Sequence, residues 1–166
     1  LGVEAYPAAE FPVSGKATEV KEKFLANGEE SFDVTIAGRM MSRRIMGKAS
    51  FFELQDSTGR IQVYVSRDDV STDENSTEYN VIFKKLMDIG DIVGIEGVVF
   101  RTDMGELSVK ASKYTHLVKA LRPLPEKFHG LTDIEERYRR RYVDLIMNEE
   151  SKNIAFTRPR IIRCIQ

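Results

Sequence analysis

The sequence predicts an all-β core with helices: a five-stranded barrel after an N-terminal helix and before a C-terminal helical segment. Three observations lead to this fold class. Five segments have the length and alternation of strands, with turn residues between them. One helical pattern interrupts the strands, between the third and the fourth. Proline and glycine then mark a connector that precedes two further amphipathic patterns.

The composition is that of an ordinary globular chain. Its 166 residues are 42% hydrophobic and 31% charged, with a net charge of −1 and one cysteine, Cys164. No apolar run reaches the roughly 20 residues of a membrane span, so no membrane partner is expected. A lone cysteine and two separated histidines, His116 and His129, favour neither a metal site nor a Ser-His-Asp site. A lone cysteine also suits the cytoplasm, which is the expected location.

The first two elements are a helix at 17–27 and a strand at 32–45. Apolar residues share one face of the helical pattern, and Asn27-Gly28 is a C-terminal stop. Gly38 lies inside the strand, and we expect a bulge or bend there.

The runs 49–55 and 60–66 predict a hairpin. In both runs apolar and polar residues alternate, and the residues Asp-Ser-Thr-Gly at 56–59 are typical of a turn. The side chains expected to face the core are Phe52, Leu54, Ile61, Val63 and Val65.

The other face of this hairpin is unusual. Closure around the turn places Phe51 opposite Tyr64 and Glu53 opposite Gln62, with Phe51 and Gln62 as diagonal neighbours. An aromatic ring among charged and amide side chains is unexpected on the face of a strand that does not contribute to the core. Either Phe51 packs under a loop or the N-terminal helix, or it serves a ligand.

A polar segment at 67–77 leads to a helix at about 77–88. Strands at 91–102 and 106–117, joined by a turn at 103–105, complete the set. Five strands with one helix between the third and the fourth have the element order of an OB-fold barrel.

The C-terminal part begins with the connector 122–130. Thr132 and Glu135 have capping-box spacing, which predicts a helix that packs one apolar stripe. That stripe consists of Ile134, Tyr138, Tyr142 and Leu145. A last helix is expected from Thr157, with Pro159 in its first turn. Because the chain stops inside that helix, we expect a fragment.

The expected domains are an N-terminal helical segment at 1–30, the OB-fold barrel at 31–121, and a connector with the start of a further domain at 122–166. The arginine run at 137–141 is interpreted as a solvated or interdomain face rather than a phosphate contact.

The OB-fold face of strands two and three, flanked by the 1–2 and 4–5 loops, binds oligonucleotides or sugars. Phe51 offers a plane for an unpaired base, and the Gln62 amide carries donors and an acceptor for its edge. Arg44 or Arg43 donates only and would favour a carbonyl, so uracil is preferred to cytosine. Glu106 either reads an N–H of a neighbouring base or is a simple hairpin charge.

A basic stripe lies beside this face. Its members are Arg39, Arg43, Arg44 and Lys48, with no acid between them. Such a stripe is typical either of nucleic-acid contact or of a solvated strand pair.

Two runs resemble the N-terminal portion of bacterial lysyl-tRNA synthetases, which are class IIb enzymes. They are GRMMSRRIMGKASFFELQDSTGRIQVYVSRDD at 38–69 and KALRPLPEKFHGLTDIEERYRRRYVDLIMN at 119–148. The Phe51/Gln62 pair is shared with aspartyl- and asparaginyl-tRNA synthetases. The connector before the arginine run points to the lysyl branch.

The resemblance implies that the barrel binds the anticodon loop of tRNA(Lys). The position of Phe51 would stack on the central uridine, Gln62 and Arg44 would bond its edge, and Glu106 would contact a flanking base. The helix from Thr157 resembles the start of class II motif 1, which builds a homodimer. The parent would join lysine to tRNA(Lys) through a lysyl-adenylate, using ATP and Mg²⁺. The chain itself is expected to hold no cofactor, no metal and no catalytic residues.

Three alternatives stay open. The parent could be an aspartyl- or asparaginyl-type synthetase. The chain could be a non-enzymatic OB-fold that binds single-stranded nucleic acid in general, although such a binder favours several aromatics along a basic groove. It could also be a free-standing paralogue or a scaffold.

Overall fold

A computed structural model describes residues 10–71, 77–122, 124, 131 and 133–166. The chain divides into two compact units, residues 1–123 and residues 124–166. The elements of the first unit are α1 (Ala17–Ala26), β1 (Asp33–Met46), β2 (Ala49–Gln55), β3 (Arg60–Ser66), α2 (Arg67–Val70), η1 (Glu78–Leu86), β4 (Ile92–Arg101) and β5 (Leu107–Val118).

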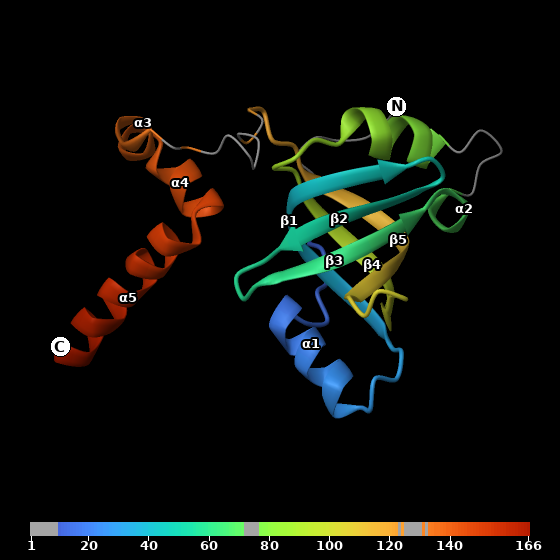
Figure 1. Cartoon of the computed structure of the whole chain (residues 1–166), viewed down its shortest axis with the longest axis horizontal. Coiled ribbons are helices and arrows are strands. Elements are labelled where there is room, and N and C mark those ends of the chain that lie inside the picture. Colours follow the sequence, from blue (N-terminus) through green and yellow to red (C-terminus); the bar gives the residue numbers. More distant parts are fainter. Residues whose placement is uncertain (1–9, 72–76, 123, 125–130, 132) are drawn as a thin grey trace. The chain divides into compact units, whose positions relative to one another are not determined.

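The five strands close into a barrel in the order β1-β2-β3-β5-β4. Four of the pairings are antiparallel, and the parallel pairing of β3 with β5 completes the ring together with the β1–β4 pairing. Figure 1 shows α1 across one end of the barrel and η1, the unlabelled yellow-green helix, across the opposite end. The predicted five-stranded barrel with an N-terminal helix is confirmed.

One hydrophobic core fills the barrel and extends under both helices. From α1 it takes Ala17, Val20 and Phe24, and from η1 it takes Tyr79 and Phe83. The five hairpin residues that alternation assigned to the core are all buried. Strand periodicity and helix amphipathicity therefore direct their apolar residues to one interior.

The β2–β3 hairpin has the predicted register, with Phe51 opposite Tyr64 and Glu53 opposite Gln62. Its turn is organised by Asp56, whose Oδ1 accepts hydrogen bonds from the backbone N–H groups of Thr58 and Gly59 at 2.7 and 2.9 Å. Oδ2 of the same carboxylate accepts from the N–H of Ala17 at 2.6 Å. One side chain thus shapes the turn and binds the first turn of α1 to it.

The sequence predicts a bulge or a bend at Gly38, and the prediction of a bulge at that residue is wrong. The pairing of β1 with β2 shifts between Met40 and Ser42 instead. A Cβ atom at Gly38 would lie 2.5 Å from the carbonyl oxygen of Gln55 and 2.5 Å from Cδ2 of Leu54. The glycine is therefore required by the close approach of β2.

The polar segment after β3 contains a feature that the sequence analysis did not predict. Its first four residues form the helical turn α2, while 72–76 lie outside the described residues. The helix expected at about 77–88 is present as η1, and it is wider than an α-helix at its end, where the N–H of Met87 bonds to the carbonyl of Ile82.

The second unit consists of α3 (Ile134–Arg139), α4 (Arg141–Met147) and α5 (Glu149–Ile165). Thr132 lies outside the described residues; Asp133 caps α3 through the N–H of Glu135 at 3.0 Å. The single helix expected after it is interrupted at Arg140, where φ is −110° and ψ is 51°.

The last helix begins eight residues earlier than predicted. Asn148 is its N-cap, and its side-chain oxygen accepts from the N–H of Glu150 at 3.2 Å. Thr157 and Pro159 consequently lie inside α5 rather than in its first turn. The predicted start is wrong because the Asn148 cap begins the helix, while Pro159 lies in its interior.

The predicted packing stripe of the second unit is also wrong. Ile134 and Tyr142 are exposed, and Tyr138 is 72% exposed. The buried residues of α4 and α5 are instead Val143, Asp144 and Ser151. Asp144 accepts from Arg137 Nε at 2.9 Å and from Arg141 Nη1 at 2.6 Å. Burial raises the pKa of Asp144, but its hydrogen bonds and the two guanidinium charges outweigh burial and lower that pKa.

The connector 125–130, with His129, lies outside the described residues. Within the described ranges, no helix combines the length and the apolar character needed to cross a membrane.

Candidate nucleic-acid interface

Phe51 lies on the outward face of β2 and is half-buried. Its ring centroid is 5.0 Å from that of Tyr64, and Tyr64 in turn meets Phe100 of β4 edge to face at 6.3 Å. The three rings lie on β2, β3 and β4 on the outside of the barrel, with β5 between the last two strands. An unpaired base can stack on such a surface, because every base has a π-face.

Gln62 lies diagonally from Phe51, as predicted. Its side chain forms no hydrogen bond with any other described residue, so both ends of the amide are available to a ligand. The neighbouring Glu53 is engaged: its Oε2 accepts from Ser42 Oγ at 3.3 Å and from Arg60 Nη1 at 3.4 Å. The face thus combines the aromatic ring of Phe51, the carboxamide of Gln62 and the carboxylate of Glu53, which is paired with Arg60.

The basic stripe separates into two groups. Arg44 lies directly opposite Phe51 in the β1–β2 pairing and is exposed. Arg43 points the other way, and its Nη1 donates to the carbonyls of Phe83 and Met87 at 2.8 and 2.6 Å, at the end of η1.

Arg39 is held by the fold in a similar way, since its Nη1 donates to the carbonyl of Gly90 at 2.7 Å. Of the three arginines in the stripe, Arg44 is therefore the one placed beside the Phe51 ring. Of the two arginines that the sequence offers as donors to a base, Arg44 pairs with Phe51 and Arg43 bonds to the end of η1.

Both loops that flank the face turn through glycines with positive φ, Gly47 at 65° and Gly105 at 85°. The β1–β2 loop carries the exposed Lys48, and the β4–β5 loop carries Met104, which is 95% exposed. Glu106 is exposed just after that second turn, and its N–H donates to Thr102 Oγ1 at 3.0 Å. Each loop therefore presents a side chain to solvent at an edge of the face.

Sequence reasoning missed Phe100 and Ser108 at this face. Ser108 pairs with Gln62 across β3–β5 and with Phe100 across β4–β5. Its alternation with Val109 was visible, but its neighbours were not, because the parallel β3–β5 pairing joins segments more than 40 residues apart. The ring of Tyr64 was already placed on this face by alternation.

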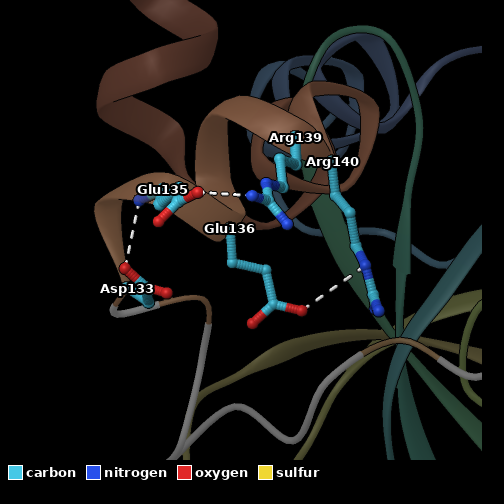
Figure 2. Close-up of a pocket in the computed structure, with 5 residues that line it drawn as sticks. All are labelled: Asp133, Glu135, Glu136, Arg139 and Arg140. Atoms are coloured by element: carbon cyan, nitrogen blue, oxygen red, sulfur yellow. Dashed lines mark hydrogen bonds and ion pairs between the residues drawn. The ribbon is translucent and has the colours of Figure 1, made fainter.

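A small cavity on α3 does not belong to this face. Figure 2 shows that its lining residues pair with one another, Arg139 with Glu135 and Arg140 with Glu136. These i, i+4 ion pairs place a carboxylate beside each arginine. Among the described residues, no three side chains of metal-ligating type gather into a cluster.

Comparison with known proteins assigns the barrel to a family. The tRNA anti-codon family, described as an OB-fold nucleic acid binding domain, matches residues 34–117. The chain is 50% identical over 176 aligned positions to the lysine–tRNA ligase of Porphyromonas gingivalis (strain ATCC 33277), an alignment that covers 100% of the chain. It is 48% identical over 170 positions to the lysine–tRNA ligase of Staphylococcus aureus (strain Mu3), covering 98% of the chain.

The chain spans 30% and 33% of the length of these two relatives. The resemblance to bacterial lysyl-tRNA synthetases seen in the two sequence runs is confirmed by these matches. The family match spans most of β1 with Arg44, all of β2 and β3 with Phe51 and Gln62, and both flanking loops. The chain belongs to the tRNA anti-codon family of OB-fold nucleic acid binding domains.

Proposed function

We propose that this chain is the anticodon-binding domain of a lysine–tRNA ligase, and that it reads the central base of the anticodon on the outward face of β2 and β3. One observation supports this most directly. A half-buried Phe51 ring lies diagonally from a Gln62 amide that is free of bonds to described residues, with Arg44 opposite the ring.

Each residue has a role that follows from its chemistry. Phe51 stacks on the base, and Gln62 pairs with its edge. Arg44 donates to a base carbonyl, which disfavours an exocyclic amine at that point. Glu106 accepts from an N–H of a flanking base, and Lys48 contacts phosphate. Arg39 and Arg43 support the face through the main-chain bonds described above and need not touch RNA.

The parent enzyme in this proposal attaches lysine to tRNA(Lys) through a lysyl-adenylate, acts as a homodimer and resides in the cytoplasm. ATP and Mg²⁺ would be bound by the greater part of the relatives' length that this chain does not span. The described residues show no cluster that suits a metal ion, and no catalytic step is assigned to them.

The proposal is tested with anticodon stem-loops that differ only at the middle base. The wild-type chain should bind the loop with a central U more tightly than the loop with a central C, by about tenfold or more, as expected for one bidentate base contact. Gln62→Ala should remove most of this preference and lower overall affinity less. Gln55→Ala is the matched control, because that amide lies on the same face but already accepts from Arg60 Nε at 2.8 Å.

Two outcomes would contradict the proposal. Equal binding of U and C loops by the wild-type chain would exclude reading of the central base. Equal binding of stem-loops and unrelated oligomers would favour a general single-strand binder, the remaining alternative of a different class.

A further inference from the structure

A carboxamide does not by itself distinguish uracil from cytosine. With Oε1 toward the base N3–H and Nε2 toward a carbonyl, Gln62 reads uracil. After a 180° flip about χ3, the same side chain offers Nε2 to N3 of cytosine and Oε1 to its amine. A preference for U therefore requires neighbours that hold the amide in one orientation.

The two strand neighbours of Gln62 are suited to this task. On β2, Glu53 lies directly opposite, and its carboxylate can only accept. On β5, Ser108 is the paired residue and carries a hydroxyl. Side chains at such paired positions have Cβ atoms about 4.5–5.5 Å apart, within reach of one another.

Glu53 is itself held in place. Ser42 Oγ and Arg60 Nη1 both donate to its Oε2, and Arg60 Nε donates to Gln55. These donors hold the carboxylate on the outward face, where Glu53 is the paired neighbour of Gln62. A carboxylate can only accept hydrogen bonds. The Glu53 carboxylate therefore favours the orientation of Gln62 in which the N–H₂ end of the amide approaches it.

Ser108 supplies the second observation. It is 0% exposed although its alternation places it on the outward side, and its Oγ has no hydrogen-bond partner among the described residues. It lies between Gln62 and Phe100 in the strand pairing. A buried hydroxyl without a partner costs free energy, so it gains from any acceptor that turns toward it.

We infer that Glu53 and Ser108 are positioning residues that orient the Gln62 amide when a base binds, with Glu53 then accepting from Nε2 and the Ser108 hydroxyl then donating to Oε1. The remaining N–H and lone pair of Gln62 then face the base as one donor and one acceptor in fixed order. This order matches the carbonyl and N3–H of uracil and rejects the amine and N3 of cytosine. The inference rests on the proposed function and adds the origin of its base selectivity.

The central experiment compares U and C stem-loops on Glu53→Gln. The substitution keeps the size of the side chain but adds an N–H₂ group, which can face Gln62 and favour the flipped amide. Discrimination between U and C should fall by about tenfold, toward equality, while affinity for the U loop falls less. Glu96→Gln is the matched control, because Glu96 is also ion-paired, with Lys113 at 3.1 Å, and is similarly exposed, at 42% against 37% for Glu53.

Ser108→Ala provides an independent variant should Glu53→Gln fail to fold. Discrimination should fall about threefold, whereas the melting temperature of the free chain should stay unchanged or rise, because the lost hydroxyl has no described partner. A residue with a merely structural role would lower the melting temperature and leave the ratio of the two affinities unchanged. The side-chain amide ¹H–¹⁵N signals of Gln62, assigned by their loss in Gln62→Ala, should shift in both variants.

The outcomes separate this inference from the proposed function. Wild-type discrimination that persists in folded Glu53→Gln and Ser108→Ala would overturn the inference and leave anticodon binding intact. A wild-type chain that binds U and C loops equally would overturn the proposed function and this inference with it. Loss of discrimination in Glu96→Gln as well would show a general charge effect and also overturn the inference.

Discussion

The two faces of the β2–β3 hairpin contrast with one another although they alternate along the same residues. Phe52 and Val63 on the inner face are buried among core side chains, and Phe52 meets Phe83 of η1 at 6.0 Å between ring centroids. Phe51 and Gln62 on the outer face are half-buried, and the Phe51 ring packs against that of Tyr64. Neighbouring residues of the same strands thus serve stability on one side and, in our proposal, recognition on the other.

The largest effect is expected on the inner face. Phe52→Ala removes a ring that is 2% exposed and leaves a cavity against Phe83. We expect a loss of about 3–5 kcal/mol in the free energy of unfolding, measured by urea denaturation. A stability close to wild type would mean that the inner and outer faces are assigned the wrong way round.

Phe51→Ala should reverse that pattern. The free energy of unfolding should change little, whereas binding of an anticodon stem-loop should weaken by about 1–3 kcal/mol through loss of stacking. Fluorescence anisotropy gives the binding constant, and thermal melting gives the stability. Phe51→Tyr serves as the control, because it keeps the aromatic plane. Unfolding of Phe51→Ala would contradict the separation of the two faces.

The turn that sets the register of both faces should show a pH dependence. Burial raises the pKa of Asp56, but hydrogen bonds from Ala17, Thr58 and Gly59 outweigh burial and lower it. A lowered folded-state pKa contributes stability above the unfolded value of about 3.9, and this stability is lost as pH falls through the folded value.

Asp56→Asn should therefore cost about 1 kcal/mol at pH 7, and this difference from wild type should shrink as the pH falls below about 4. Urea denaturation at a series of pH values measures it. Asp103→Asn, at the exposed turn of the β4–β5 hairpin, is the control. A constant difference across that range would show that the Asp56 charge contributes nothing to the turn.

The smallest effect is expected at the loop beside the outer face. Lys48→Ala should weaken all stem-loops alike, by less than about 1 kcal/mol at physiological salt, and reduce the salt dependence by about one counterion. Titrations at several salt concentrations give this slope. A change that depended on the central base would instead place Lys48 among the base-reading residues.

The bounds and register of β2 and β3 could be predicted because the information is local. Strict alternation in two short runs and a turn signal between them leave one pairing that buries every apolar residue on one side. The site residues Phe51 and Gln62 followed from that pairing alone. The C-terminal helices could not be predicted in the same way: the side chains around Asp144 decide which face is buried, and the Asn148 cap rather than Pro159 begins α5.

The sequence by itself determined the five strands, the two hairpin faces and the placement of the Phe51 ring on the outer face, because period-two alternation and turn residues act between positions close along the chain. Only the tertiary structure decided what surrounds that ring. The parallel β3–β5 pairing places Ser108 beside Gln62. Arg43 bonds to carbonyls at the end of η1 instead of lying on the outer face. These contacts depend on barrel closure, which pairs segments far apart along the chain, and no local pattern records which distant side chain will become a neighbour.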